Sequence, residues 1–298
     1  MTNLNRSAGS AVSWRHRLAV PWLTAWRLYD SLRPRRQGFR ILLFHDVPES
    51  QLGRFERLVD HVRETHGILS PEQAAAWIET GAPAPAAAAG RRAPCLLSFD
   101  DGFVSNHRLA ARILAPRGLT GLFFVCPGLV DLAGDAQRQA IAARVFNGRR
   151  QAGDLADDER MMSWPEIEDL RAQGHTVGCH GLSHRRLSEL DGGELEEEIG
   201  GGADLLATRL GGTTPWYAFS FGDVGSVSPK ALAMIGERFR FCRSGVRGLN
   251  TPATPPGALL AEQIDLSAPP AYQNLVAEGG LDFRYGAARA RLSAMAAG

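Results

Sequence analysis

The sequence predicts an α/β fold built on parallel strands, either a layered sheet or a barrel. Short runs of aliphatic and aromatic residues, with the length of buried strands, alternate with helical patterns over about 200 residues. Several helical patterns begin with a readable cap: an N-cap serine, a proline in the first turn, and then Gln or Glu. Ser70-Pro71-Glu72-Gln73 and Ser163-Trp164-Pro165-Glu166 are two examples. In parallel α/β folds the chemistry lies at the carboxyl ends of the strands.

Polar or glycine-containing sequence follows most of the predicted strands. His45-Asp46 stands at the end of the first run, Asp100-Asp101-Gly102 follows the second, and His180 follows the fourth. We therefore expect the functional site to be assembled from these strand ends. The five runs, in chain order, are Ile41–His45, Cys95–Phe99, Leu122–Cys126, Thr176–Cys179 and Trp216–Phe221.

The composition excludes several classes of protein. Hydrophobic residues make up 44% of the 298 residues and charged residues 22%, which excludes wholesale disorder. Lys+Arg 33 against Asp+Glu 32 gives a net charge of +1, so no nucleic-acid partner is expected. A nucleotide-dependent enzyme is disfavoured because no G-x-G-x-x-G or phosphate-loop motif follows a strand. Four widely spaced cysteines predict free thiols in a reducing compartment: Cys95, Cys126, Cys179 and Cys242.

The N-terminal segment supports two interpretations. Its apolar runs are interrupted by Arg15, Arg17 and Arg27, so we expect neither a membrane-spanning helix nor a cleaved signal peptide. We therefore expect a cytoplasmic protein. Residues 14–36 mix tryptophans with arginines, as in helices that lie in a membrane interface, which predicts peripheral contact with the inner membrane face. The alternative is a helix whose aromatic side packs on the domain.

An acid pair and a histidine pair carry the strongest chemical signal. Asp100 and Asp101 directly follow a buried run, where two like charges must raise a pKa or recruit a cation. Gly102 permits the chain to turn there, so the two side chains need not point to opposite faces as they would in a strand. His180 and His184 are spaced so that a helix or tight turn brings both imidazoles to one face. Two imidazoles with one carboxylate suit a metal site that keeps open positions.

With these motifs the sequence resembles the polysaccharide deacetylase family, also called the NodB-homology domain or carbohydrate esterase family 4. The resemblance covers about residues 38–270 and depends on motifs whose order and spacing agree with the family. These are Leu43–Val47, Ser98–Gly102 (SFDDG), Met162–Gly178, His180–His184 (HGLSH, with Gly181 where Ser or Thr is usual) and Tyr217–Gly222 (YAFSFG).

The resemblance implies a distorted (β/α) barrel of about seven parallel strands. It implies one divalent metal ion, Zn²⁺ first and Co²⁺ or Ni²⁺ as alternatives, with Asp101, His180 and His184 as ligands. Asp100 would then be the general base, and a backbone N–H near Phe221 would stabilise the oxyanion. The implied domains are a basic, helical extension over residues 1–37, the deacetylase domain over 38–270 and a helical tail over 271–298.

Three departures from the family pattern bear on catalysis. Ala218 stands where fuller versions of the third motif carry an arginine that orients the catalytic aspartate, and Ser220 replaces the usual proline. Arg243 or Arg247 is a candidate replacement for the missing guanidinium. The usual late histidine, the general acid, is absent, because every histidine lies at or before His184.

His45 is the candidate general acid, and the alternative is that it is a supporting histidine. The late strand around Leu260–Leu266 offers only Glu262 and Asp265. Cys179 adjoins His180, but strand alternation turns it to the opposite face, so we expect it in the core.

These observations predict a metal-dependent hydrolase that removes N-acetyl or other acyl groups from an amino sugar in a polysaccharide, glycolipid or lipid-linked intermediate. The alternative is a degenerate family member that binds metal or sugar with little catalysis, because two catalytic residues of the pattern are missing.

Overall fold

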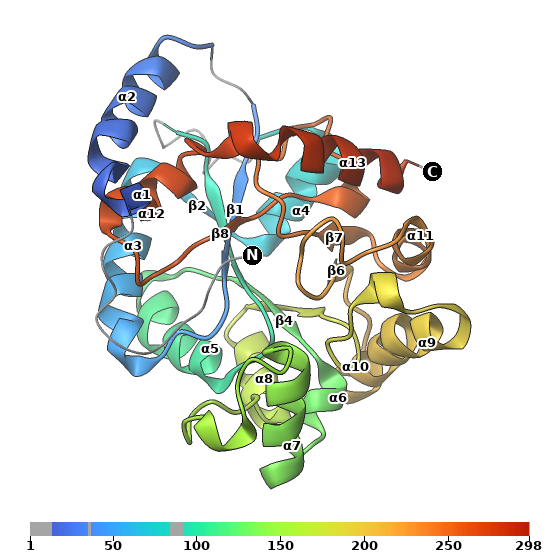
Figure 1. Cartoon of the computed structure of the whole chain (residues 1–298). Helices are drawn as coiled ribbons and strands as arrows, with labels where there is room; N and C mark the ends of the chain where they lie inside the picture. The colour runs from blue at the N-terminus through green and yellow to red at the C-terminus, as the bar shows by residue number, and fades with distance from the viewer. Residues whose placement is uncertain (1–13, 35–36, 84–91, 298) are drawn as a thin grey trace.

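The computed structural model describes residues 14–34, 37–83 and 92–297, and its centre is one sheet of parallel strands (Figure 1). The strand order is β7-β6-β5-β4-β3-β1-β8, and the short strand β2 pairs with β3. The strands are β1 Arg40–Phe44, β2 Ile68–Leu69, β3 Cys95–Phe99, β4 Leu122–Val125, β5 Thr176–Cys179, β6 Trp216–Ala218, β7 Phe241–Arg243 and β8 Glu262–Gln263.

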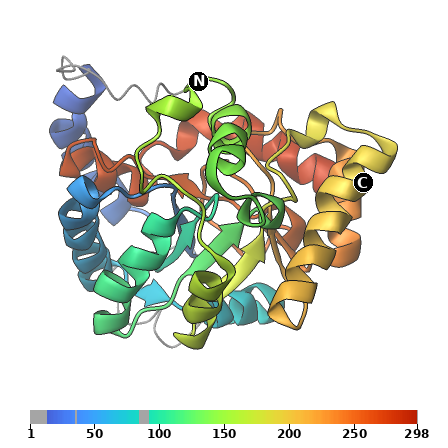
Figure 2. The same ribbon diagram turned by 90° about the horizontal axis from the view of Figure 1, so that it is seen from below.

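The sheet curls into the distorted barrel that the sequence predicts. Its two edge strands, β7 and β8, approach each other, because Leu259, just before β8, forms a parallel bridge with Arg243 of β7. The backbone N–H of Leu259 donates to Cys242 O at 2.8 Å, and that of Ser244 donates to Leu259 O at 2.8 Å. Seen from below, the helices surround the strands (Figure 2).

Helices connect the strands and cover the outside of the barrel. The predicted caps at Ser70 and Ser163 are present: Ser70 N donates to Gln73 Oε1 at 2.9 Å, and Ser163 N donates to Glu166 Oε2 at 2.7 Å. The α-helices are α1 Trp14–Arg17, α2 Ala19–Ser31, α3 Leu52–Thr65, α4 Pro71–Thr80, α5 Val104–Leu109, α6 Pro127–Val130, α7 Gly134–Ala140, α8 Trp164–Ala172, α9 Gly192–Glu196, α10 Gly202–Leu210, α11 Pro229–Arg238, α12 Pro270–Ala277 and α13 Gly286–Ala296.

Strand alternation divides the core into two layers. Side chains such as Ile41, Phe124 and Trp216 form a cluster inside the barrel, while Leu42 and Phe99 belong to a larger cluster shared with the surrounding helices. Both faces of the strands are buried, which is why the sequence shows continuous apolar runs rather than alternation.

Helix α2 lies against α12 at the side of the barrel (Figure 1). Trp26 Nε1 donates to Glu278 O at 3.1 Å, and the Arg27 guanidinium contacts the Glu278 carboxylate at 2.6 Å. One side of this helix, which carries Leu23 and Trp26, therefore packs on the domain, while Trp22 and Tyr29 are exposed. The beginning of the predicted extension, residues 1–13, lies outside the described residues, as do 35–36 of the predicted membrane-contact segment. No helix in the described chain is long and apolar enough to cross a membrane.

Candidate active site

The site lies where β3 and β5 end, on either side of β4. Asp100 and Asp101 leave the end of β3, and His180 follows β5 directly. Because β3 pairs with β4 and β4 with β5 in parallel register, these carboxyl ends meet at one edge of the sheet. Asp101 has φ 71° and Gly102 φ 85°, so the chain turns sharply here. Both carboxylates approach His180 Nε2, Asp101 at 3.5 Å and Asp100 at 3.8 Å.

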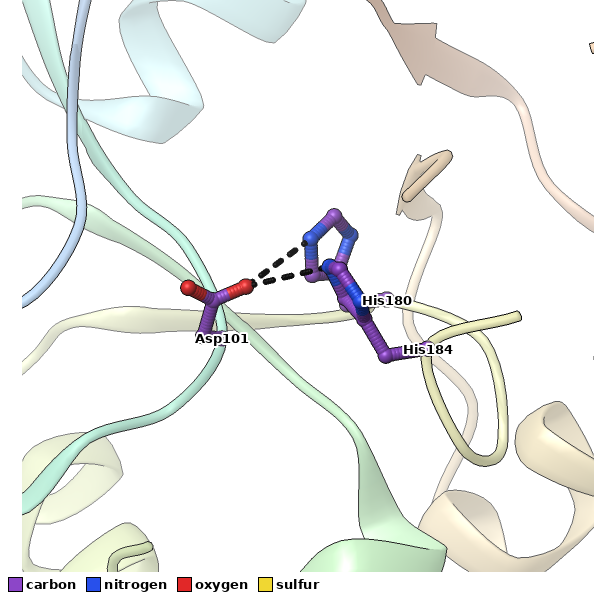
Figure 3. Close-up of side chains that lie close together, drawn as sticks. All are labelled: Asp101, His180 and His184. Atoms are coloured by element: carbon purple, nitrogen blue, oxygen red, sulfur yellow. Dashed lines mark ion pairs between the residues drawn. The ribbon is translucent and has the colours of Figure 1, made fainter. Parts of the chain in front are cut away.

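Asp101, His180 and His184 form a buried cluster whose ligand atoms all lie within 4.8 Å of one another. One oxygen of Asp101 lies 3.5 Å from His180 Nε2 and 3.3 Å from His184 Nε2 (Figure 3). The other nitrogen of each ring points to a backbone carbonyl: His180 Nδ1 donates to Ala218 O at 2.6 Å and His184 Nδ1 to Arg144 O at 3.2 Å. This arrangement leaves both Nε2 atoms for a cation, so the donor set fits a divalent metal.

Electrostatics tie the same groups together. Burial alone would raise the pKa of Asp101, but hydrogen bonds with His180 and His184 outweigh it and hold that pKa well below its usual value. Burial alone would lower the pKa of His180, but the charges of Asp100 and Asp101 outweigh it, and the pKa of His180 is raised. Negative charge thus surrounds the imidazoles, as a cation site requires.

Asp100 points into the barrel, where the Arg243 guanidinium forms an ion pair with its Oδ1. Arg243 lies on β7, directly opposite Ala218 of β6 in the parallel register. Its side chain is fully buried and lies over the Phe124 ring at 5.0 Å. The guanidinium absent at position 218 is therefore supplied from the next strand. The other sequence candidate, Arg247, faces Glu262 at 3.5 Å instead.

Phe221 and His45 complete the edge of the site. The Phe221 ring lies edge-on to His184, with centroids 4.8 Å apart. Among the described residues, its backbone N–H has no hydrogen-bond acceptor and is free to bind one. His45 is half-buried at the end of β1. Its charge is a further cause that lowers the pKa of Asp101, smaller than burial and the interactions with His180 and His184. His45 therefore lies within electrostatic range of the cluster.

The backbone is strained around this site. In the described chain, the non-glycine residues with positive φ are Asp101 (71°), Asn147 (50°), His184 (62°) and Phe221 (66°). Each such conformation costs about 1–3 kcal/mol and persists only where the surrounding structure imposes it, which is common at functional sites. All of them belong to the cluster of Asp101, His180 and His184 or to the cavity beside it.

Sequence reasoning missed the residue that shapes the histidine loop. The buried Glu198 accepts hydrogen bonds from Ser183 N at 2.9 Å, Ser183 Oγ at 2.8 Å and Arg185 N at 3.1 Å. It also explains Gly181, because a Cβ there would lie 2.5 Å from Glu198 Oε1. The only signal in the sequence was the acidic run 194–198, which is typical of a solvated helix.

Two other sequence candidates do not reach the cluster. The carboxylate of Glu262 faces Arg40, with Oε1 2.5 Å from a guanidinium nitrogen. The Cys179 thiol is packed in the outer core, and burial raises its pKa to about 12, so it does not act as a thiolate ligand.

Comparison with known proteins decides the family. The family model described as polysaccharide deacetylase matches residues 88–239, about half of the chain. The chain belongs to the polysaccharide deacetylase family. Members of this family are hydrolases that remove acyl groups from carbohydrate, and the site described above contains its acid and histidine motifs. None of the proteins with curated functional descriptions matches this sequence.

Solved structures of deacetylases share the fold. IcaB from Ammonifex degensii is 21% identical, with a TM-score of 0.61, and the alignment covers 82% of this chain and 98% of that one. Streptococcus pyogenes deacetylase PplD, solved with acetate, is 17% identical, with a TM-score of 0.60 over 82% of this chain and 99% of that one. A de-N-acetylase from Aggregatibacter actinomycetemcomitans is 11% identical, with a TM-score of 0.60 over 80% and 100%.

Proposed function

We propose that this protein is a metal-dependent hydrolase that removes the N-acetyl group, or another acyl group, from an amino sugar in a polysaccharide, glycolipid or lipid-linked intermediate. The observation that carries the proposal is the buried pairing of Asp100 with Arg243 beside the Asp101, His180 and His184 cluster. A deacetylase needs both parts: a base held in position and a cation site next to it.

The three ligands would hold one divalent ion, with Zn²⁺ as the first choice and Co²⁺ or Ni²⁺ as alternatives. When bound, the ion supplies Lewis acidity at the acyl carbonyl and at the attacking water. The hydrogen bonds from the two Nδ1 atoms fix the orientation of the imidazoles, so the site is preorganised.

Asp100 takes the proton of the water as the water attacks the amide carbon, and Arg243 orients the carboxylate through their ion pair. The Phe221 backbone N–H donates a hydrogen bond to the developing oxyanion. His45 then delivers a proton to the nitrogen as the C–N bond breaks, which releases the free amine and the carboxylate of the acyl group.

Metal analysis and acetate release from N-acetylated amino sugars test this proposal together. We expect purified protein to contain a divalent metal and to release acetate. Asp100→Asn should keep the metal and lose about 10²- to 10⁴-fold in rate, while Asp101→Asn should lose the metal. Asp157→Asn removes an exposed carboxylate as a matched control. Metal-free wild-type protein, or an Asp100→Asn variant with wild-type turnover, would contradict the proposal.

The same experiment tests the alternative of a metal- or sugar-binding module. Such a module would retain metal and sugar affinity but release no acetate, with or without Asp100. The guanidinium that Arg243 supplies to Asp100 favours the enzyme, because the missing arginine at position 218 was one of the two reasons for suspecting degeneration.

We also propose that α2 contacts an anionic membrane surface at the cytoplasmic face. In the described chain, every large apolar side chain that is exposed, except Leu132, lies on or beside this helix. Phe283 stacks on Trp22, and the exposed Arg17 and Arg33 flank the apolar face. An apolar helix face bordered by Trp, Tyr and Arg suits the headgroup region of a bilayer. The other exposed apolar residues are Leu18, Val20, Leu28, Tyr29 and Leu32.

Binding to lipid vesicles tests this contact without disturbing the side of α2 that packs on the domain. We expect the full chain to co-sediment with vesicles that contain phosphatidylserine, and Leu28→Glu with Leu32→Glu to abolish co-sedimentation while the thermal unfolding midpoint is kept. Leu132→Glu, an exposed leucine away from the helix, is the control. Equal co-sedimentation of all variants would contradict the contact.

A further inference from the structure

A cavity of about 360 Å³ opens beside the metal-ligand cluster, within the size range of small-molecule sites. His184 and Phe221 line it, and so do Arg144, Arg185 and Arg186. The carbonyl of Arg144 accepts the hydrogen bond from His184 Nδ1 at 3.2 Å, so the arginine-bearing segment directly adjoins a metal ligand. A molecule bound in the cavity is therefore next to the reacting centre.

The charge of the cavity wall is positive. Three arginines and one acid, Glu189, line it, which gives three minus one, a formal charge of +2. Arg144 is exposed, and its guanidinium forms no ion pair within the described chain. Arg185 forms an ion pair with Glu194 at 2.6 Å. Glu194 is half-exposed and does not line the cavity.

The Arg186 side chain is held in place by a ring contact and two long ion pairs, which leave its charge only partly compensated. Its guanidinium lies over the Phe221 ring at 4.4 Å from the centroid, and its nitrogens are 3.6 Å from Glu189 and 3.4 Å from Asp223. Both of those acids are exposed to solvent, so these long ion pairs hold the arginine only weakly and leave it able to bind an anion. Guanidinium groups bind phosphate oxygens in pairs of hydrogen bonds, better than other side chains do.

The cavity is also where the backbone is strained. Asn147, His184 and Phe221, three of the non-glycine residues with positive φ in the described chain, all line it. Strain of this kind indicates that the fold imposes the shape of the wall. A shaped, positively charged wall next to the reacting centre is a recognition site for a charged group of the substrate.

We propose that the amino sugar this site deacylates carries a phosphate group, which the arginines of the cavity bind. The inference rests on the proposed function, since it concerns the substrate of the same site. A neutral glycan would leave Arg144 without a counter-charge and Arg186 with only its long ion pairs to exposed acids. A sugar phosphate, or a sugar linked through phosphate to a carrier, supplies the missing negative charge.

Binding measurements test the inference separately from catalysis. Glucosamine 1-phosphate, the deacylated product of such a substrate, and methyl glucosaminide, its neutral counterpart, would be titrated into the metal-loaded wild-type protein by calorimetry. We expect the phosphate to bind at least about tenfold more tightly, because hydrogen bonds between a guanidinium and a phosphate are charge-assisted. Arg144→Gln combined with Arg186→Gln should reduce this ratio at least about tenfold.

The control variant is Arg149→Gln, which removes an exposed arginine of the same segment that does not line the cavity. It should leave the ratio unchanged. A ratio that persists in the double variant would show that the metal alone binds the phosphate and would overturn the inference, as would equal affinity for the two sugars. Because Arg144 is exposed, Arg144→Gln alone serves as a variant that leaves packing undisturbed.

Turnover distinguishes the two proposals. If acetate is released equally from N-acetylglucosamine 1-phosphate and its methyl glycoside, the substrate inference fails and the deacylase stands. If neither sugar releases acetate while the arginine-dependent phosphate affinity is present, the proposed function fails and the phosphate site stands. A nucleotide-linked and a short polyprenyl-linked N-acetylglucosamine would then distinguish a soluble from a lipid-borne phosphate.

Discussion

The charge of Asp100 is balanced by a residue on a different strand from the one that the family motif uses. Ala218 and Arg243 are opposite each other on β6 and β7, and alternation directs both side chains into the barrel. A buried ion pair of this kind costs several kcal/mol when one partner is removed, because the other charge remains unpaired.

Replacing Arg243 tests this compensation. We expect Arg243→Ala to lower the rate of acetate release about 10- to 100-fold and to destabilise the fold. Arg243→Ala combined with Ala218→Arg should recover part of the rate, because the guanidinium again reaches Asp100 from the neighbouring strand. Arg247→Ala is the control for loss of a nearby arginine. A double variant no more active than Arg243→Ala would contradict the exchange between strands.

Gly181 makes a second prediction at the level of a single residue. Restoring the serine that is usual at this position should destabilise the protein by about 1–3 kcal/mol, because φ is +80° and a Cβ would collide with Glu198 Oε1. Thermal unfolding measures the change. Gly153→Ser introduces the same side chain where nothing lies within 4 Å and should be neutral. An unchanged midpoint for Gly181→Ser would show that Glu198 does not fix the loop.

At the scale of elements, the strand that carries His180 begins with a histidine that must stay neutral. His175 precedes β5, and its Nδ1 accepts a hydrogen bond from Gly121 N at 3.0 Å, which joins β5 to the start of β4. Burial lowers the pKa of His175 to about 4, against 6.5 in the unfolded chain. The unfolded state therefore binds more protons between these values, and stability is lost as the pH falls from about 6.5 to about 4.

Stability curves of wild type and His175→Gln test this prediction. Because Gln does not titrate, the variant should lose less stability than the wild type between pH 6.5 and 4, as measured by denaturant unfolding. Other titrating groups cancel in the difference, including His66, whose pKa burial also lowers to about 4. Parallel curves for the two proteins would show that His175 does not contribute.

At the scale of the whole molecule, an ionic contact joins the two ends of the described chain. Glu278 is almost fully buried after α12, and its carboxylate contacts Arg27 of α2 and Arg92, which precedes β3. Trp22 and Trp26 donate to backbone carbonyls of the same segment, at 3.3 and 3.1 Å. We infer that α2 is a structural part of the domain whose outer face remains available to a membrane.

Removing the Arg27 side chain should therefore affect the whole fold. We expect Arg27→Ala to lower the free energy of unfolding by about 1–3 kcal/mol, because a buried carboxylate loses one of its two cationic partners. Arg33→Ala removes an exposed arginine near the end of the same helix and should have little effect. If the two variants were equally stable, α2 would be a detachable extension.

The sequence by itself determined the fold class and the family. Continuous apolar runs indicated buried parallel strands, because both faces of such strands are covered, and the acid and histidine motifs stood at their ends. The short strands β2 and β7 were not predicted, since two or three residues give no measurable periodicity. Strand β8 lies within the late strand expected around Leu260–Leu266.

Only the tertiary structure decided which arginine meets Asp100, why Gly181 replaces a serine, and which residues form the cavity wall. Each of these depends on residues far apart in the sequence: Arg243 is 143 positions from Asp100, and the sheet register alone brings them together. A local sequence pattern indicates whether a residue is buried and in which kind of element it lies. Which side chains meet across the barrel depends instead on the order of the strands and on the alternation of side chains along each strand. The family and its motifs were therefore visible in the sequence, whereas the pairing of Arg243 with Asp100 and the arginines of the cavity wall were not.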